Sequence, residues 1–292
     1  MSANRNAVFR NYYQSRQLRK RTNQVVVSLV LMAGSLLFLS PLWWMFVTSV
    51  KTMQEVMAYP PTWWPSEVVW SNYVKAWNSA PFTRYTLNTL FISGFVVLGS
   101  VLSNSFVAYG FAKIRFRGRD FLFTVVLGTM MLPGFVTLIP QYILFAKLGW
   151  LNTYLPLIIP PFTAGAFFIF LNRQFLLSIP NELIEAAKID GASHFYTWSR
   201  LMLPLTKPIL ATTAIFTFNG SWNDLLGPLL YLNDEKLYTL QIGLSTFKGQ
   251  VQTQWHYLMA ASLLVLLPVV ALFFAFQKYF IKGMDLTGGM KG

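Results

Sequence analysis

The chain has 292 residues, of which 54% are hydrophobic and 17% aromatic, while only 11% carry a charge. A soluble domain of ordinary composition has about 25% charged residues, so this composition excludes a typical soluble domain and equally a disordered chain. The absence of cysteine from the sequence excludes a disulfide scaffold, thiol catalysis and thiolate metal sites. We therefore predict an all-α polytopic membrane protein.

Six long stretches of the chain carry at most one charged side chain each. They cover residues 25–50, 85–112, 121–146, 148–172, 208–233 and 257–277. Because a bilayer core is crossed by about 20 helical residues, we expect six transmembrane helices within a membrane domain at 25–280. The first stretch is too long for the apolar core of a signal peptide and is expected to remain as a helix.

Basic residues are divided unequally between the two sides that six spans define. One side comprises the N-terminal tail 1–24, the loop after the second span, the segment 173–207 and the C-terminal end. It holds 17 of the 23 lysines and arginines, and the other side holds 6. Since cytoplasmic segments are enriched in Lys and Arg, we expect both tails, 1–24 and 281–292, in the cytoplasm. This topology explains the net charge of +13 without a nucleic-acid partner.

Tryptophan has the opposite distribution. Most tryptophans lie at or beyond the expected outer ends of the spans: Trp43, Trp44, Trp63, Trp64, Trp70, Trp77, Trp150 and Trp255. They form either an interfacial aromatic belt or, around the proline-rich outer loop 51–84, a docking surface for an external protein.

Prolines interrupt three of the expected spans. They are Pro133, Pro140, Pro156, Pro160, Pro161 and Pro228. Proline kinks a helix, and kinked helices line translocation paths, but proline is also simply commoner in membrane helices than in soluble ones. Both interpretations remain open from the sequence.

The cytoplasmic segment 173–206 predicts two short helices joined at a turn. Pro180 suits the start of the first helix, Gly191 suits the left-handed turn that ends it, and Ser193 is a good N-cap for the second. At helical spacing, Phe195, Trp198 and Met202 share one face of the second helix, which Pro204 is expected to end. Taken alone, this pattern also fits a helical hairpin lying on the bilayer surface.

The order of residues in this segment is more specific than a generic hairpin. Its residues Glu185, Ala186, Ala187, Asp190, Gly191 and Ala192, followed by Leu203-Pro204 and Pro208, resemble the EAA coupling loop of binding-protein-dependent ABC importer permeases. Further similarities are Asn72-Tyr73, the stretch 109–118, Trp222-Asn223-Asp224, Tyr238-Thr239-Leu240, residues 259–262, Leu267-Pro268 and the tail from Gln277. These match the maltose-type carbohydrate subgroup, and the tail departs from it at Met284–Gly289.

The resemblance implies a type I ABC importer permease fold with a cytoplasmic coupling-helix loop. It implies four kinds of partner: a homologous second permease, a dimer of ATP-binding subunits, an extracytoplasmic solute-binding protein, and a sugar or oligosaccharide as substrate. ATP and Mg²⁺ would be bound by the ATPase, so no cofactor is expected in this chain. The location implied is the cytoplasmic (inner) membrane of a bacterium or archaeon.

Catalytic motifs are missing from the sequence. It contains no P-loop, no H-E-x-x-H metal motif and no G-x-S-x-G nucleophile elbow, so we expect a transport subunit and not an enzyme.

Asp224 is the single carboxylate in an expected span, and an intramembrane charge is a functional candidate by default. It lies about 26 Å along its helix from Lys207, at 1.5 Å per residue. With Asn219, Trp222 and Asn223 it is a candidate for the substrate path, and helix–helix hydrogen bonding is the alternative.

Two other functions are consistent with a polytopic chain. A secondary carrier or channel driven by an ion gradient predicts charged relays in several spans, whereas this sequence has one such carboxylate. A lipid-modifying enzyme predicts a catalytic cluster at one membrane interface, which the sequence does not contain.

Overall fold

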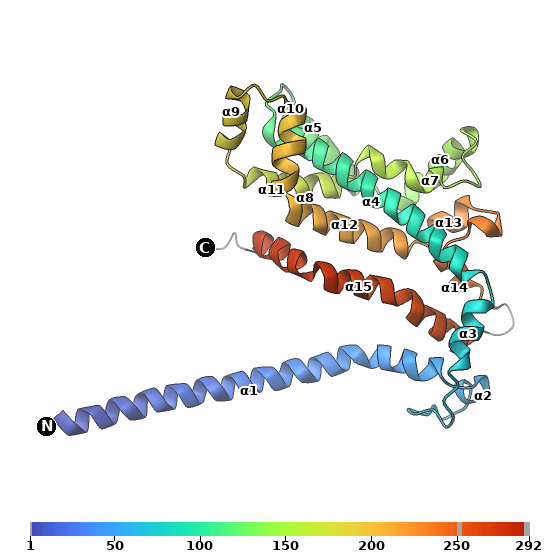
Figure 1. Cartoon of the computed structure of the whole chain (residues 1–292), viewed down its shortest axis with the longest axis horizontal. Helices are drawn as coiled ribbons and strands as arrows, with labels where there is room; N and C mark the ends of the chain where they lie inside the picture. The colour runs from blue at the N-terminus through green and yellow to red at the C-terminus, as the bar shows by residue number, and fades with distance from the viewer. Residues whose placement is uncertain (1, 250–252, 289–292) are drawn as a thin grey trace.

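The computed structural model describes residues 2–249 and 253–288, with side chains from 23 to 249 and from 253 to 277. Apart from one isolated bridge between Lys248 and Thr253, the regular structure of these residues is helical (Figure 1). The α-helices are α1 (Ser2–Ser49), α2 (Met53–Val56), α3 (Ser71–Asn78), α4 (Phe82–Lys113), α5 (Arg119–Gly128), α6 (Gly134–Lys147), α7 (Leu155–Ile158), α8 (Ala166–Leu177), α9 (Glu182–Ile189), α10 (His194–Tyr196), α11 (Leu203–Leu205), α12 (Lys207–Trp222), α13 (Leu226–Tyr231), α14 (Leu240–Ser245) and α15 (Trp255–Gly288).

Four described helices are long and apolar enough to cross a membrane singly: Asn23–Ser49, Phe82–Lys113, Leu155–Leu177 and Trp255–Gln277. Two sharply bent helix pairs, Arg119–Thr129 with Gly134–Lys147 and His194–Leu205 with Lys207–Trp222, raise the total to as many as six. The all-α membrane fold predicted from the sequence is confirmed.

Three predicted spans differ from the observed helices. The third is broken by a 93° bend at Pro133, whose ring is incompatible with a continuing helix. The fourth begins at Leu155 and ends at Leu177, several residues later than predicted at both ends. The fifth stops at Trp222, and a short α13 follows after a break.

The predicted tails are helical where the structure describes them. The N-terminal tail, from residue 2 onward, forms the first turns of α1, and residues 281–288 continue α15. Residues 289–292, together with the side chains of the C-terminal tail, lie outside the described part of the chain.

Helix α4 is the centre of the bundle, packed against both α8 and α12. Neutral polar contacts join these helices: Ser93 donates to Ser221 at 3.0 Å, the hydroxyls of Ser100 and Thr217 lie 3.1 Å apart, and Asn172 donates to Thr213 at 2.9 Å. Among the described side chains the single ion pair is between the sequence neighbours Arg119 and Asp120. The membrane core is therefore held by apolar packing and hydroxyl or amide hydrogen bonds.

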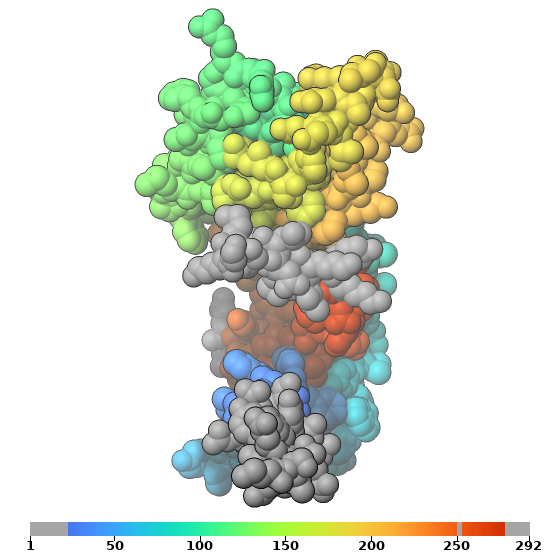
Figure 2. Space-filling model, turned by 90° about the vertical axis from the view of Figure 1, so that its left-hand side faces the viewer, coloured from blue at the N-terminus to red at the C-terminus, as the bar shows by residue number. Residues whose placement is uncertain are grey.

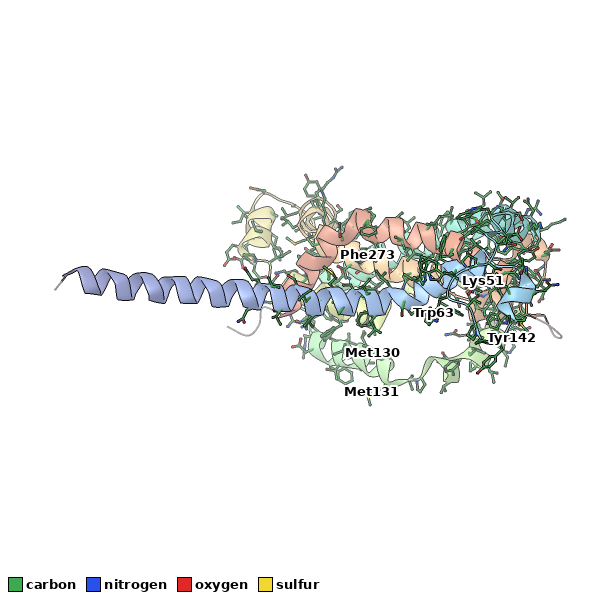
Figure 3. The ribbon with its side chains drawn as sticks, turned by 90° about the horizontal axis from the view of Figure 1, so that it is seen from below. Lys51, Trp63, Met130, Met131, Tyr142 and Phe273 are labelled. Carbon is green, nitrogen blue, oxygen red and sulfur yellow. The ribbon has the colours of Figure 1, made fainter. Side chains whose placement is uncertain are left out.

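Different helices and chain ends lie at the two ends of the bundle (Figure 1). The start of α1, the end of α15 and helix α9 lie at one end, and α2, α3 and α14 lie at the other. At the second end, Lys51 is only 2% exposed and donates to the carbonyl of Thr62, which ties the loop between α2 and α3 to the end of α1. Figure 3 shows Lys51 beside Trp63 there, and Met130 and Met131 on the turn between α5 and α6 that projects from the bundle.

Candidate functional site: the coupling loop and the central cavity

The segment after α8 folds as two short helical pieces around a glycine turn, as the sequence predicts. Helix α9 starts two residues after Pro180. Gly191 has a φ of +80°, in the left-handed region where glycine carries no steric cost. The Ser193 hydroxyl accepts the backbone N–H of Tyr196 at 3.2 Å and so caps the second piece.

The second helical piece differs from the prediction in its winding. Residues Thr197–Met202 form a π-helix, which turns more slowly than the 3.6-residue period assumed from the sequence. Trp198 and Met202 are buried, while Phe195 is 64% exposed although its ring centroid lies 5.5 Å from that of Trp198. Pro204 does not end this piece; the chain bends by 82° between Leu205 and Lys207.

The residues of the EAA motif lie on an accessible surface. Glu185, Ala186, Asp190 and Gly191 are exposed, and Ala187 and Ala192 are partly exposed. Ile184 points the other way and is buried, whereas Ile189 is 87% exposed. Figure 2 shows this α9–α10 region, in yellow, projecting at the end of the molecule. Helix α9 is thus packed along one side through Ile184 and leaves its opposite side exposed.

A cavity of about 430 Å³ lies between α4, α8, α12 and the segment 155–165, within the size range of small-molecule sites. Its polar lining residues are Thr89, Ser100, Asn104, Thr217, Ser221, Asp224 and Thr239. Of the prolines noted in the sequence, Pro160, Pro161 and Pro228 line it. Pro133 and Pro140 do not, so the proline pattern locates the cavity only in part.

Irregular backbone accompanies the cavity where the fourth span is broken. Ala164, a lining residue, has a φ of +64°, a strained conformation for a residue with a Cβ atom. The next N–H, of Gly165, donates to the side-chain oxygen of the buried Asn104 at 2.8 Å. A freed backbone group beside the cavity is therefore satisfied by a side chain from α4, as a membrane interior requires.

The four candidate path residues are separated by the structure. Asp224 lines the cavity, and its Oδ1 accepts the N–H of Gly227 at 3.1 Å, so it also caps α13. A Cβ atom at Gly227 would lie 2.5 Å from Asp224 Oδ2, which shows how closely the carboxylate fits there.

Asn219 and Asn223 are exposed, hydrogen bonded to each other, and outside the lining of this cavity. Trp222 is 1% exposed, and its indole N–H donates to the carbonyl of Val265 at 3.1 Å. The tryptophan is a core residue joining α12 to α15, and its ring does not reach the cavity.

Sequence reasoning missed the small polar residues of α4. Thr89, Ser100 and Asn104 line the cavity and recur at intervals of eleven and four residues in a mostly apolar span, which places them on one face of a helix. That periodicity was the available signal for the cavity wall. The described residues contain no group of three or more His, Cys, Asp or Glu that could hold a metal ion.

Residues 95–286 match the family model of the binding-protein-dependent transport system inner membrane component. The chain belongs to this family. The match covers the coupling loop, most of α15 and all of the cavity lining except Thr89 and Ile92.

Named relatives agree with this assignment. The permease is 34% identical to the probable ABC transporter permease protein YurM of Bacillus subtilis, over 86% of this chain and 83% of the relative. It is 37% identical to the arabinooligosaccharides transport system permease protein AraQ of Halalkalibacterium halodurans, over 78% and 81%. It is 35% identical to the sn-glycerol-3-phosphate transport system permease protein UgpE of Escherichia coli, over 87% and 93%.

A solved structure confirms the permease fold. A chain in the crystal structure of a bacterial ABC transporter involved in import of the acidic polysaccharide alginate superposes with a TM-score of 0.78 at 25% identity. The match covers 89% of this chain and 97% of that one. The type I importer fold expected from the sequence is therefore observed, and the relatives are transport subunits and not enzymes.

Proposed function

We propose that this permease forms half of the translocation path of an ATP-driven importer for a sugar or oligosaccharide. The observation that carries the proposal is the combination of two features in one bundle. An exposed EAA segment projects at one end, and a polar-lined cavity lies between the helices to which that segment is attached. The names of the relatives, AraQ above all, support a carbohydrate as the cargo.

The partners follow from what the chain lacks and what it exposes. Its sequence has no P-loop, so a separate pair of ATPase subunits binds ATP and Mg²⁺ and docks on the surface from Glu185 to Ala192. A homologous permease supplies the other half of the path, and an external solute-binding protein delivers the sugar. The chain itself holds no cofactor in this proposal.

The orientation of the chain follows from its charges. The basic N-terminal tail, the end of α15 and α9 share one end of the bundle, and the excess of Lys and Arg marks that end as cytoplasmic. Reporter fusions after residue 292 and within 234–249 should then report opposite sides of the cytoplasmic membrane. An external C-terminus would contradict this topology.

Asp224 is the residue of this chain that we assign to the sugar path, with the hydroxyls of α4 and α12 beside it. A carboxylate accepts sugar hydroxyls through charge-assisted hydrogen bonds. We assign Asn219 and Asn223 to the same path as exposed residues of α12 and its C-terminal end, outside the cavity itself. Trp222 belongs to this group as the buried residue that joins α12 to α15.

Asp224→Asn and Asp224→Ser test this role, because Asn and Ser cap a helix about as well as Asp does but remove the charge. In complexes purified with the ATPase and partner permease, both variants should assemble normally and raise the apparent KM for sugar about tenfold, the low end of what losing a hydrogen bond to a charged group causes. Unchanged uptake kinetics in both would remove Asp224 from the path. Failure of the wild-type chain to co-purify with an ATPase would instead contradict the importer assignment.

A further inference from the structure

Helix α4 forms a wall of the cavity but has no direct peptide link to the coupling loop. The loop follows α8 and precedes α12 in the chain, so both of those helices must move when it moves. In the chain α4 is separated from the loop by α5, α6, α7 and α8. Any movement of the loop therefore reaches the α4 wall only through non-covalent contacts.

Those contacts comprise the packing of α4 against α8 and α12 and, at the C-terminal end of α4, direct contacts with the loop itself. An apolar cluster joins the two: Ala108, Tyr109, Ala112, Leu176, Ile184, Trp198 and Met202. Two polar contacts flank it. The Tyr109 hydroxyl lies 3.2 Å from His194 Nδ1, at the second helical piece. The Lys113 ammonium donates to the carbonyl of Ile179 at 2.6 Å and to Asn181 Oδ1 at 2.9 Å, where α9 starts.

The Lys113 contact takes the place of an ordinary helix cap. Asn181 occupies the N-cap position of α9 but makes no capping hydrogen bond within its own helix, although Asn is a preferred cap. Its side-chain oxygen accepts from Lys113 instead. The side chain at the N-cap position of α9 is thus bonded to α4 and not to its own helix. The bond is charge-assisted and therefore stronger than a neutral hydrogen bond.

We propose that Lys113 is a positioning residue that makes α4 follow the coupling loop, so that movement driven by the ATPase reaches the cavity wall at Ser100 and Asn104. The inference rests on the proposed importer function. Apolar packing is non-directional and does not by itself fix the register between the loop and α4. The two directed bonds of Lys113 fix the start of α9 to the last turn of α4.

The cysteine-free sequence allows a direct test in the complete transporter with its partner permease and ATPases. A Ser100→Cys/Thr217→Cys pair reports the α4–α12 distance, because these hydroxyls lie 3.1 Å apart. An Asn172→Cys/Thr213→Cys pair reports the α8–α12 distance, where the side chains lie 2.9 Å apart. The rate of disulfide formation is measured for each pair without nucleotide and with ATP plus vanadate.

In the transporter that keeps Lys113, ATP plus vanadate should change the rate of disulfide formation of the α4–α12 pair. Lys113→Met should reduce that nucleotide-dependent change about tenfold, the low end of what losing a hydrogen bond to a charged group causes. The α8–α12 pair should keep its response, because that link is covalent. Lys113→Arg should retain the response, since a guanidinium also donates to two oxygens.

Arg117→Met is the matched control, since Arg117 is exposed on the adjacent loop and makes no described hydrogen bond or ion pair; it should behave as the parent. Asn181→Ala removes the same contact from the other partner and serves if Lys113→Met does not assemble. An α4–α12 response unchanged in both Lys113→Met and Asn181→Ala overturns the inference. Absence of any nucleotide response in the parent complex, at either pair, overturns the proposed function and the inference with it.

Discussion

Gly191 offers the cleanest single perturbation of the coupling loop. Its φ is +80°, and a Cβ atom built there would meet no atom within 4 Å. Gly191→Ala therefore introduces no clash, and its cost is the conformational penalty of a Cβ-bearing residue in the left-handed region, about 1–2 kcal/mol. That penalty lowers the population of the observed turn by a factor of about 5–30.

Three matched variants separate this cost from other effects. Gly191→Asn should lose less, because Asn tolerates the left-handed conformation better than other residues with a Cβ. Gly191→Pro should lose more, about 3 kcal/mol or above, since the Gly191 N–H that donates to the carbonyl of Lys188 at 3.0 Å is also removed. Gly110→Ala makes the same chemical change inside α4, where φ is not positive and nothing lies within 4 Å, and should be neutral or slightly stabilising.

The assay is ATP-driven uptake into vesicles, normalised to the amount of assembled complex, with co-purification of the ATPase measured in parallel. Uptake should be highest in the parent with Gly191 and should fall in the order Gly191→Asn, Gly191→Ala and Gly191→Pro. The Gly110→Ala variant should transport at the parent level. Equal uptake by the Gly, Asn and Ala variants would refute the claim that the turn must hold its left-handed conformation for coupling.

Three further predictions concern other parts of the fold. Asn72 is buried and donates to the carbonyls of Ser49 and Lys51 at 2.9 and 2.8 Å; Asn72→Ala should lower the unfolding free energy by about 2–3 kcal/mol, and an unchanged melting temperature in detergent would contradict this. Desolvation raises the pKa of Glu55, but hydrogen bonds from Ser66 and Thr62 together outweigh that effect, so the pKa lies below its ordinary value. The stability these bonds give the outer loop is therefore present above the ordinary Glu pKa and lost as the pH falls through the lower folded value. Protease resistance of the loop should fall at acid pH, and Glu55→Gln should abolish that dependence. Finally, a Cβ at Gly99 would lie 2.4 Å from the Phe162 ring, so Gly99→Ala should destabilise by about 1–3 kcal/mol; Gly94→Ala, which meets nothing within 4 Å, should not.

Features governed by local chemistry were predictable from the sequence. The turn at Gly191 and the cap at Ser193 are found as expected, because each depends on the backbone preference of one residue type. The membrane class was equally predictable, since it follows from long apolar stretches.

Features governed by tertiary contacts were not predictable in the same way. Trp222 was grouped with the path because tryptophan beside polar residues fits a sugar site, but its N–H is bonded to α15, a partner 43 residues away in the chain. The π-helix at Thr197–Met202 is likewise a feature that an i, i+3, i+7 spacing of apolar residues cannot indicate. The break after Trp222 was not predicted. Asp224 there accepts the N–H of Gly227 at the start of α13, a contact that the spacing of residues does not indicate.

The scarcity of ion pairs among the described side chains makes ionic strength a useful probe of this transporter. Contacts between hydroxyls and amides, such as Ser100 with Thr217, carry no net charge and are little affected by screening. The charged groups that salt does reach include Glu185 and Asp190 on the exposed surface of the coupling loop. The salt dependence of ATP-driven uptake should therefore report contacts at the coupling loop, namely the docking of partner proteins and the Lys113 contact at the start of α9, and leave the hydroxyl and amide contacts between the helices unaffected.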